Sequence, residues 1–442
     1  MRLCIFLFFA NCILLGSCND FVDVDTPPNQ LTRQSVFINA TSIEAGLAGI
    51  YSNLSGINHS LNAEMHIGTS LYSDELHYSG SLQQYLDFEA SAIQTNNTII
   101  SGVWADTYQT IYSINDALEG IANSQLAESI TNPYIGELKF LRSFCYFNLI
   151  NLYGDVPLIT GVDFEINSSL PRTPTNEIYD QIVIDLKDAL TLLPRLYVGS
   201  EKRSRPNYFA ACALMARVSL FMQNWQDSYL FSSEVINDDN YSLGDLSQVF
   251  LKDSPETIWQ LIPVTTPYNT NIGRLTVPLN VNNNAIPDFF LSDNMLSNFE
   301  QKDLRAANWI GIKTVNEQKY YFPYKYKINT SSEVTEFLIV FRLVEQYLIR
   351  AEALIEQGKL PEAKRDLEIV RSRAGLPPLT IELDSEKLRS ALMHEKKLEL
   401  FLEWGLTWFD KRRLRQNNLE DYWPIPLTEL ERNPNLEQNT QY

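Results

Sequence analysis

The chain has 442 residues, of which 45% are hydrophobic and 12% aromatic, so it has ample material for a core and is neither disordered nor of low complexity. Its 54 acidic residues against 35 basic ones give a formal net charge of -19 at pH 7. A surface this acidic repels phosphate backbones, which argues against nucleic-acid binding. Acidic faces combined with many aromatic rings fit a protein that binds sugars or peptides outside the cytoplasm.

The first seventeen residues are predicted to be an export signal. Arg2 is their only charged residue, and residues 3–15 form an apolar run broken only by Asn11. This run is too short for a resident membrane helix, which needs roughly twenty residues. A positive start, a short apolar segment and small residues before a boundary are typical of a secretory signal peptide, here residues 1–17.

The boundary itself, Leu15-Gly16-Ser17-Cys18, resembles the lipobox of bacterial lipoproteins. In such proteins a peptidase cleaves before the cysteine, whose sulfur carries a diacylglycerol, so Cys18 is the expected lipid anchor. The alternative is an ordinary secreted protein with a chance cysteine. Residues 18–34 are acidic and contain Pro27-Pro28, which favours an extended tether. In lipoproteins of the Bacteroidota, such an acidic stretch resembles a signal for display on the cell surface.

Cysteine usage agrees with this interpretation. Cys4 and Cys12 leave with the signal, and Cys18 is the anchor, so the mature body retains Cys145 and Cys212. An exported protein built on disulfides would carry more cysteines. Both remaining cysteines lie in apolar helical stretches, where buried free thiols are expected, and a Cys145–Cys212 bridge stays open as the alternative.

Helical periodicity dominates the body, with apolar residues recurring at spacings of three and four. The expected helices are residues 42–54, 103–121, 135–152 and 176–193, the last capped by Thr175. The third helix is expected to end at Gly154, which suits a C-cap, before Pro157.

Two further segments look like copies of one helix pair. They are residues 208–223 with 225–237, and residues 344–357 with 361–374, the second pair turning at Gly358-Lys359. A period of about 33 residues, with small side chains where the helices approach, resembles the tetratricopeptide hairpin.

The helical pattern breaks down in two zones. Residues 240–335 contain six prolines, a run of three asparagines and short β-like pieces such as residues 257–262. So long an irregular insertion is uncommon unless it is functional, and loops on a rigid scaffold are where ligands usually bind. Residues 65–101 are predicted to form a second irregular zone.

The sequence contains none of the catalytic motifs considered below. The sequence lacks a Gly-x-Ser-x-Gly elbow, a phosphate loop and a dinucleotide glycine pattern, and no histidine pair has the spacing of a helical zinc site. No catalytic residue, metal or cofactor is therefore predicted. Glu395, Glu399 and Glu403 recur every four residues. They are expected to form a solvated or structurally paired helix face, with a charged partner surface as the alternative.

Several stretches of the sequence, taken together, match the motifs of one known family. They are residues 140–149 (FLRSFCYFNL) with 152–158 (LYGDVPL), residues 342–353 (RLVEQYLIRAEA) with 370–376 (VRSRAGL), residues 395–400 with 403–410 (EWGLTWFD), and the tail 423–442. Their order and joint presence resemble the SusD/RagB family of outer-membrane nutrient-binding lipoproteins. Asn115 also fits the second helix of that family. Leu406, Thr407 and Lys396 depart from its usual residues, which affects local salt bridges.

The resemblance implies a mainly α fold, in which tetratricopeptide-like helical hairpins form a scaffold with long irregular loop and short-strand insertions. Residues 35–442 are then one SusD-like domain, with a helical part at 35–239, an irregular ligand-face insertion at 240–335, and a second helical part with the tail at 336–442. Family members cap a SusC-like, TonB-dependent transporter in the outer membrane. They bind an oligosaccharide, or sometimes a peptide, and deliver it for uptake without making or breaking a bond.

The ligand residues are a hypothesis based on residue type, because aromatic rings stack on sugar faces and polar side chains bind hydroxyls. The candidates in the two irregular zones are Tyr72, Asp74, Tyr78, Tyr85, Trp309 and Tyr321. The alternative for each ring is a half-buried packing role. Alanine at Trp309 or Tyr78 is expected to weaken binding without lowering the melting temperature. The rings expected in the core are Trp104, Trp225 and Trp408.

Two other functions stay open. A pure helical-repeat scaffold would need no ligand pocket, and a glycoside hydrolase would need two carboxylates facing each other across a cleft. The sequence leaves the identity of the glycan or peptide undetermined.

Overall fold

The computed structural model describes residue 37 and residues 39–199, 203–414 and 422–442. The predicted signal peptide 1–17, the anchor Cys18 and the tether 18–34 lie outside the described residues. Within the described residues, no helix combines the length and apolar character needed to cross a membrane.

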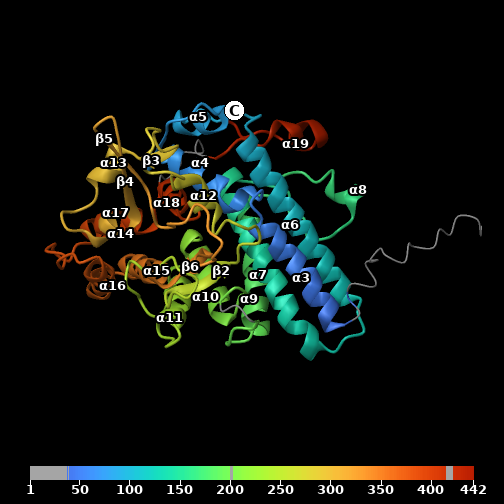
Figure 1. The fold of residues 1–442 in the computed structure, drawn as a ribbon. Helices are drawn as coiled ribbons and strands as arrows, with labels where there is room; N and C mark the ends of the chain where they lie inside the picture. Colours follow the sequence, from blue (N-terminus) through green and yellow to red (C-terminus); the bar gives the residue numbers. More distant parts are fainter. Residues whose placement is uncertain (1–36, 38, 200–202, 415–421) are drawn as a thin grey trace, which may run out of the picture.

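Long helices build most of the molecule (Figure 1). The N-terminal helices that pack side by side are α3 (Ala40–Ser55), α6 (Thr98–Ala122), α7 (Glu128–Tyr153) and α9 (Thr175–Leu192). The two predicted hairpins are α10 (Tyr208–Phe221) with α11 (Trp225–Ile236), and α15 (Leu343–Glu356) with α16 (Leu360–Arg373). They are followed by α17 (Ser385–Leu400) and α18 (Leu406–Leu414).

Short elements fill the remainder of the described chain. The short helices are η3 (Ser60–Asn62), α4 (Glu64–Tyr72), α5 (Gln83–Glu89), α8 (Phe164–Asn167), α12 (Asn271–Thr276), α13 (Asp293–Ser297), α14 (Leu304–Trp309) and α19 (Leu427–Arg432). The strands are β1 (Leu76–Tyr78), β2 (Thr257–Leu261), β3 (Phe289–Leu291), β4 (Ile310–Val315), β5 (Gln318–Pro323) and β6 (Leu338–Arg342). They form three antiparallel pairs, β1 with β3, β2 with β6, and β4 with β5. The fold is thus mainly helical with short-strand insertions, as predicted.

The predicted helices are confirmed, although α6 begins at Thr98 rather than at residue 103 and α7 at Glu128 rather than at residue 135. The ends of the helices follow local chemistry. Gly154 closes α7 with a φ of 76°, a conformation that glycine adopts without strain. The expected cap at Thr175 is wrong, because the N-cap position is Pro174 and the capping group comes from a distant loop. The carboxylate of Asp155 accepts hydrogen bonds from the backbone N–H and the hydroxyl of Thr175, at 2.7 and 2.6 Å.

The prediction that residues 65–101 are irregular is also wrong. This stretch contains most of α4, all of β1 and α5, and the start of α6. Residues 65–71 of α4 are all buried, including Gly68 and Ser70. A helix that is covered on every side has no apolar stripe, so periodicity could not reveal it.

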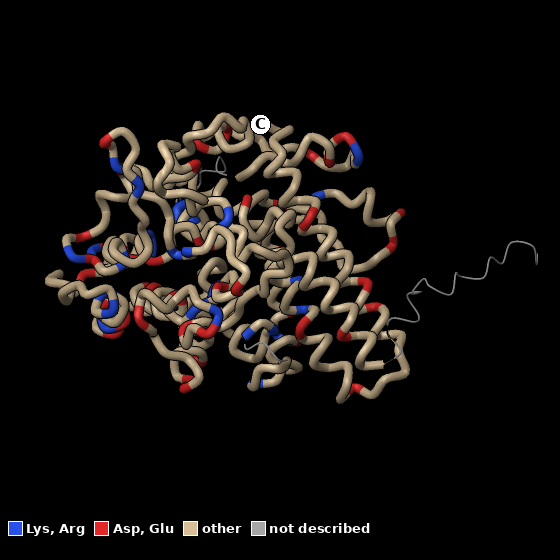
Figure 2. Tube along the Cα trace, viewed as in Figure 1, with Lys and Arg blue, Asp and Glu red and all other residues tan. Residues whose placement is uncertain are grey.

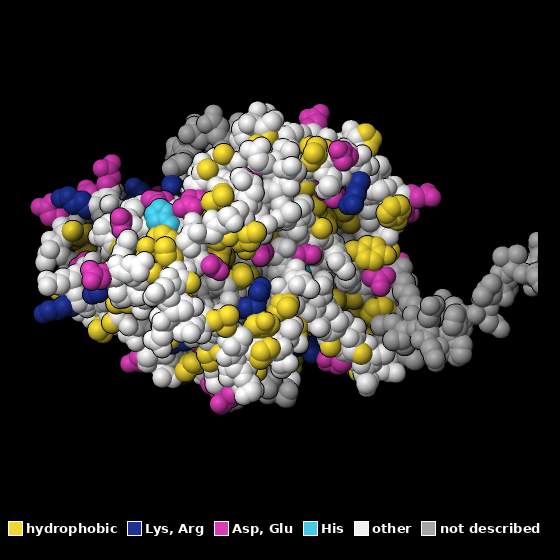
Figure 3. All heavy atoms as spheres, turned by 45° about the horizontal axis from the view of Figure 1, so that its top comes forward, with side chains coloured by type: hydrophobic (Ala, Val, Ile, Leu, Met, Phe, Trp, Pro, Cys, Tyr) yellow, Lys and Arg dark blue, Asp and Glu magenta, His cyan; other side chains and the backbone are white. Residues whose placement is uncertain are grey.

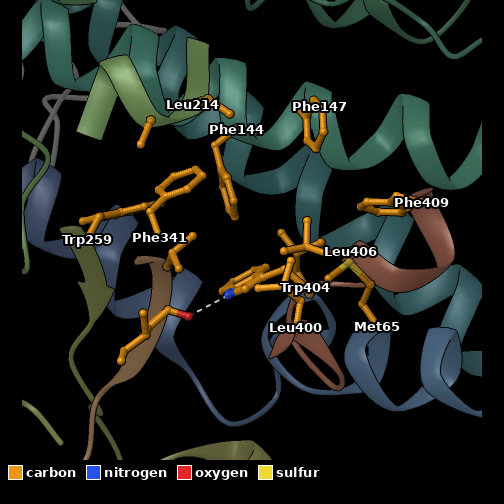
Figure 4. Close-up of a cluster of buried hydrophobic side chains, with 14 of the residues drawn as sticks. Met65, Phe144, Phe147, Leu214, Trp259, Phe341, Leu400, Trp404, Leu406 and Phe409 are labelled. Carbon is orange, nitrogen blue, oxygen red and sulfur yellow. Dashed lines mark hydrogen bonds between the residues drawn. The ribbon is translucent and has the colours of Figure 1, made fainter. Parts of the chain in front are cut away.

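One hydrophobic core joins the helical parts to the strands (Figure 4). Phe144 on α7 meets the rings of Trp259 on β2 and Trp404, which follows α17, at centroid distances of 5.3 and 5.2 Å. The indole N–H of Trp404 donates to the carbonyl of Ile339 on β6, at 2.7 Å. These contacts hold segments from distant parts of the sequence in one packed unit.

The smaller expectations about the core have mixed outcomes. Trp104 and Trp408 are buried, as predicted, whereas Trp225 is half-buried against a small separate cluster that includes Ala216 and Ile349. Cys145 and Cys212 are buried free thiols, so the alternative of a bridge between them does not hold. Burial raises the pKa of each thiol to about 12.

The acidic repeat on α17 is buried and paired rather than solvated. Arg342 Nη1 lies 2.7 Å from Glu399 Oε1, and Arg342 Nε lies 2.7 Å from Glu403 Oε2. Arg305 contacts both Glu395 and Glu399, at 2.5 and 3.3 Å. Figure 2 shows basic and acidic residues intermixed where α14–α17 lie. We call the set Glu256, Arg305, Arg342, Arg373, Glu395, Glu399 and Glu403 the buried ion lattice.

The electrostatics of the lattice depend on its arginines. Burial by itself would raise the pKa of Glu399, but Arg373, Arg342 and Arg305 outweigh it and hold that pKa well below the ordinary value of 4.5. At Glu403, burial again raises the pKa, but the charges of Arg342 and Lys325 outweigh burial, so the pKa of Glu403 is also lowered. These two carboxylates therefore stabilise the fold above pH 4.5, and this stabilisation is lost as the pH falls towards their folded-state pKa values.

We expect Arg342→Met to lower the free energy of unfolding by about 3–5 kcal/mol, because it leaves several buried carboxylates without a partner. The loss, measured by urea denaturation at pH 7, should shrink below pH 4.5, where the stranded carboxylates take up protons.

Arg365→Met is the matched control, because Arg365 is exposed and makes only a loose 3.8 Å contact with Glu362. It should change stability by less than about 1 kcal/mol. Equal effects of the two substitutions would show that the lattice does not stabilise the fold.

Candidate ligand-binding surface

An aromatic surface forms where β1, β3 and β5 meet. Its members, which we call the aromatic platform, are His77, Tyr78, Tyr85, Phe289, Phe290 and Tyr320. The antiparallel register of β1 and β3 sets Tyr78 opposite Phe289 and His77 opposite Phe290. Because neighbouring residues of a strand point to opposite faces, each of these pairs occupies one face of the ribbon.

The Tyr78 face of the platform is tightly packed. Tyr78 stacks on Phe289 with a centroid distance of 5.1 Å and an interplanar angle of 28°. Tyr85, from α5, contacts both rings at 4.9 and 5.0 Å. Tyr85 and Phe289 are buried, whereas Tyr78 is half-buried, so Tyr78 is the ring of this face that reaches solvent.

The His77 face is more open. The ring of Phe290 lies 5.5 Å from that of His77 and 5.3 Å from that of Tyr320 on β5, and all three residues are half-buried. Lys313 is the residue opposite Tyr320 in the β4–β5 pair and so belongs to the same face. This face therefore runs continuously from β1 across β3 to the β4–β5 hairpin.

Carboxylates hold the platform in place. Glu89 accepts from the backbone N–H of Tyr78 at 3.3 Å and lies 2.9 Å from Nδ1 of His77. The hydroxyl of Tyr85 donates to Glu64 at 2.8 Å. Burial and then the charge of Glu64 raise the pKa of Tyr85 far above its ordinary value, so this tyrosine remains a protonated donor.

An exposed arm, residues 279–286, adjoins the platform just before β3. Leu279 is 79% exposed, and the asparagines at 282–284 are exposed as well. The buried ammonium of Lys313 donates to the carbonyl of Asn280 at 2.9 Å and to the side-chain oxygen of Asn283. The arm therefore brings amide groups, which can bind hydroxyls, to the edge of the aromatic surface.

The predicted ligand residues lie in different parts of the structure and differ in their exposure. It brings Tyr78 and Tyr85 together, although Tyr85 is buried. Asp74 is exposed, adopts a φ of 58°, and accepts from Asn294 at 2.8 Å beside the strand pair. Tyr72 is elsewhere, because its ring packs edge-on against Trp408 and lines a separate hollow of about 480 Å³. Tyr321 neighbours Tyr320 on β5 and so points to the other face of that strand.

The placement of Trp309 corrects the prediction. Its side chain is 0% exposed, its indole N–H donates to the carbonyl of Leu246 at 3.0 Å, and its ring packs edge-on against Phe250. The ammonium of Lys325 lies 4.9 Å from the ring centroid. The packing alternative therefore holds for Trp309, which offers no free face to a ligand.

Sequence reasoning missed four platform residues: His77, Phe289, Phe290 and Tyr320. A signal for them exists in the three adjacent ring pairs His77-Tyr78, Phe289-Phe290 and Tyr320-Tyr321. In a strand, each such pair supplies one ring to each face. Because the prediction selected single rings rather than adjacent pairs in short strands, it left out most of the platform.

Among the described residues, no cluster of three or more His, Cys, Asp or Glu side chains is arranged to hold a metal ion. The surface instead combines rings with amide and carboxylate groups at its margin. Such an arrangement can stack against flat apolar faces and bind hydroxyl groups at their edges.

Comparisons with known proteins point to one family. Residues 20–220 match a family described as starch-binding and associating with the outer membrane, and residues 298–421 match the SusD family. SusD-like protein P25 of Formosa agariphila is 26% identical, with 98% of this chain and 96% of that protein covered. SusD-like protein P38 of the same organism is 22% identical, covering 99% of this chain and 98% of that protein.

Solved structures show the same fold. A SusD superfamily protein from Bacteroides vulgatus superposes with a TM-score of 0.80 at 20% identity, over 91% of this chain and 99% of that one. A laminarin-binding SusD-like protein superposes with a TM-score of 0.76 at 23% identity, over 92% and 100% of the two chains.

We expect Trp309→Ala to lower the free energy of unfolding by about 3–5 kcal/mol, because it leaves a cavity in the core. Tyr78→Ala, at a half-buried position, should cost only about 1 kcal/mol. Urea denaturation of both variants provides the comparison, and Trp309→Phe, which retains a ring, should recover much of the loss. A Trp309→Ala protein as stable as the wild type would contradict the core assignment.

Proposed function

Because the chain belongs to the SusD/RagB family, we propose that it binds a carbohydrate at the cell surface and delivers it to a SusC-like, TonB-dependent transporter of the outer membrane. The transporter would lie beneath the protein, which closes over it as a lid. The ligand is captured and passed on unchanged, so the protein acts as a binder and not as an enzyme.

The observation that carries this proposal is the aromatic platform, whose two faces each present half-buried rings. Sugar rings present apolar C–H faces, which stack on aromatic side chains, and hydroxyl edges, which need polar partners. Phe290 and Tyr320 supply half-buried rings on one face of the β1–β3 ribbon, and Tyr78 supplies one on the other face. Asp74 and the asparagines of the exposed arm supply polar groups. Of the residues expected from the sequence, Tyr78 and Asp74 therefore remain the proposed ligand contacts.

The carboxylates next to the platform support binding rather than hydrolysis. Glu89 is engaged by His77 and by the backbone N–H of Tyr78, and Glu64 is engaged by Tyr85. A glycosidase needs an acid and a second carboxylate that both face the scissile bond. Here both groups face platform residues and position the rings.

We also propose that residues 35–442 act as a single domain, with the insertion 240–335 providing most of the ligand face. The platform takes β1 and α5 from the N-terminal helical part, and β3 and β5 from the insertion. Ligand contact would thus depend on both parts of the chain.

The ligand is expected to be a neutral glycan. The chain carries a formal net charge of -19, so a sulfated or uronate-rich polysaccharide would meet an unfavourable field. The laminarin-binding relative of known structure and the starch-binding description of the matching family make laminarin and starch the first probes.

The binding test uses the soluble body from Asn19 onward and calorimetry against laminarin, starch, xylan, an anionic glycan and a peptide mixture. We expect saturable binding of a neutral glycan with no product released. Tyr78→Ala and Tyr320→Ala should each weaken that binding about tenfold, equivalent to about 1.4 kcal/mol, because each removes a stacking ring. Tyr347→Ala, on α15 away from the platform, is the matched control and should bind as the wild type does.

Normal binding by both platform variants would place the ligand face elsewhere. Release of shorter saccharides would favour the glycosidase, and the absence of binding to every probe would favour the helical-repeat scaffold. Capture of a TonB-dependent transporter from detergent-solubilised outer membranes by the lipidated protein would test the partner separately.

We propose further that the protein is anchored through a lipid on Cys18 and faces the cell exterior. Cys18→Ser should abolish incorporation of labelled palmitate and move the protein from the membrane to the soluble fraction, because one residue carries the acyl chains. Cys12→Ser, within the predicted signal peptide, is the matched control and should leave both unchanged. A Cys18→Ser protein that stays labelled and membrane-bound would rule out this anchor.

A further inference from the structure

A concave surface lies away from the platform, where α6, α8 and α19 meet. It is a groove of about 580 Å³, within the range of roughly 300–1,000 Å³ that is usual for small-ligand sites. In Figure 1, the elements β3, α5, α19 and α8 follow one another along the upper edge, so the platform and the groove occupy different parts of it. Figure 3 shows apolar side chains gathered near α8 and α19.

One wall of the groove is a stripe of rings on α6. Trp104, Tyr108 and Tyr112 are spaced by four residues and therefore share one helix face. Trp104 is buried and its ring lies 5.0 Å from that of Tyr108, whereas Tyr112 is 50% exposed. The hydroxyl of Tyr108 donates to the carbonyl of Pro157 at 2.8 Å, which fixes the ring against the neighbouring loop. The stripe thus runs from the core out to solvent.

The opposite wall is α8, whose side chains do not pack in the core. None of its four residues is buried, and Phe164 is 79% exposed while it lines the groove. The helix is held by polar contacts, because Asp163 caps it and Asn167 donates to the carbonyl of Gly161 at 3.1 Å. Phe164 and the exposed Tyr112 line the same groove, and contiguous exposed apolar side chains are a feature of binding surfaces.

Polar groups line the rim of the same groove. Glu429 and Arg432 on α19 form an exposed pair at 3.0 Å, and Asn433 and Asn167 also line the site. The pair carries no net charge, so the rim does not select a charged ligand. Two ring-bearing walls with amide, carboxylate and guanidinium groups at the edge match a sugar, which has apolar faces and hydroxyl margins.

We propose that this groove is a second binding site for a neutral oligosaccharide, separate from the aromatic platform. The assignment of ligand class rests on the proposed function. A short saccharide occupies either site, and a long chain reaches both, so that the second contact becomes intramolecular and raises the apparent affinity.

The test uses calorimetry on the body from Asn19 onward, with hexasaccharides and intact chains of laminarin and of starch. The groove variant combines Tyr112→Ala with Phe164→Ser, both at exposed positions, and Tyr78→Ala is the platform variant. Leu196→Ser, at another exposed apolar position, is the control. We expect two hexasaccharides per wild-type chain. In either variant, one site should keep its wild-type affinity and the other should bind at least about tenfold more weakly. The groove variant should also bind the intact polysaccharide at least about tenfold more weakly.

The outcomes separate the two proposals. One hexasaccharide per wild-type chain, with unchanged binding by the groove variant, would overturn the groove site and leave the proposed function standing. Failure of the wild type to bind any of these glycans would overturn both. A groove variant that loses its melting transition would be replaced by Tyr112→Ser alone, for which the same weakening of one site is expected.

Discussion

The structure depends on the pairing of charges that have been removed from water. Arg342, at the end of β6, is surrounded by Glu256, Glu399 and Glu403, which come from the start of β2, from α17 and from the segment after it. A buried charge without a partner costs several kcal/mol, so an arrangement of these elements that separated the charges would be strongly disfavoured. These ion pairs thereby fix the insertion and the C-terminal helices to each other.

The candidate ligand surface is built on this framework. Arg305 of α14 belongs to the buried ion lattice, and α14 leads directly into β4, so the β4–β5 hairpin starts from an anchored point. Trp309 ends α14 and packs into the core beside Lys325, which adds an apolar anchor to the ionic one. The hairpin in turn presents Tyr320 to Phe290 and holds the exposed arm through Lys313. A rigid interior therefore positions rings that lie at the surface.

Both candidate sites use the same chemistry in different local structures. The platform takes adjacent ring pairs from short strands, where alternation sends one ring to each face. The groove takes rings at every fourth position of a long helix, where the helical repeat places them in a stripe. In both cases the polar partners are amides and paired carboxylates, which suits a ligand with many hydroxyls and no charge. A mainly helical scaffold with short-strand insertions can thus present aromatic rings at more than one surface.

The sequence alone indicated the long helices, the end of α7 at Gly154 and a family resemblance, because these depend on local periodicity, on turn residues and on motifs read in order. It could not reveal α4, which is buried on all sides, or the role of Trp309, since burial depends on distant segments. The platform exists only because β1 pairs with β3 from the insertion, and the groove only because α8 and α19 come to lie against α6. Those are long-range contacts selected by the packing of the whole chain, and they decided which aromatic rings remain free to meet a ligand.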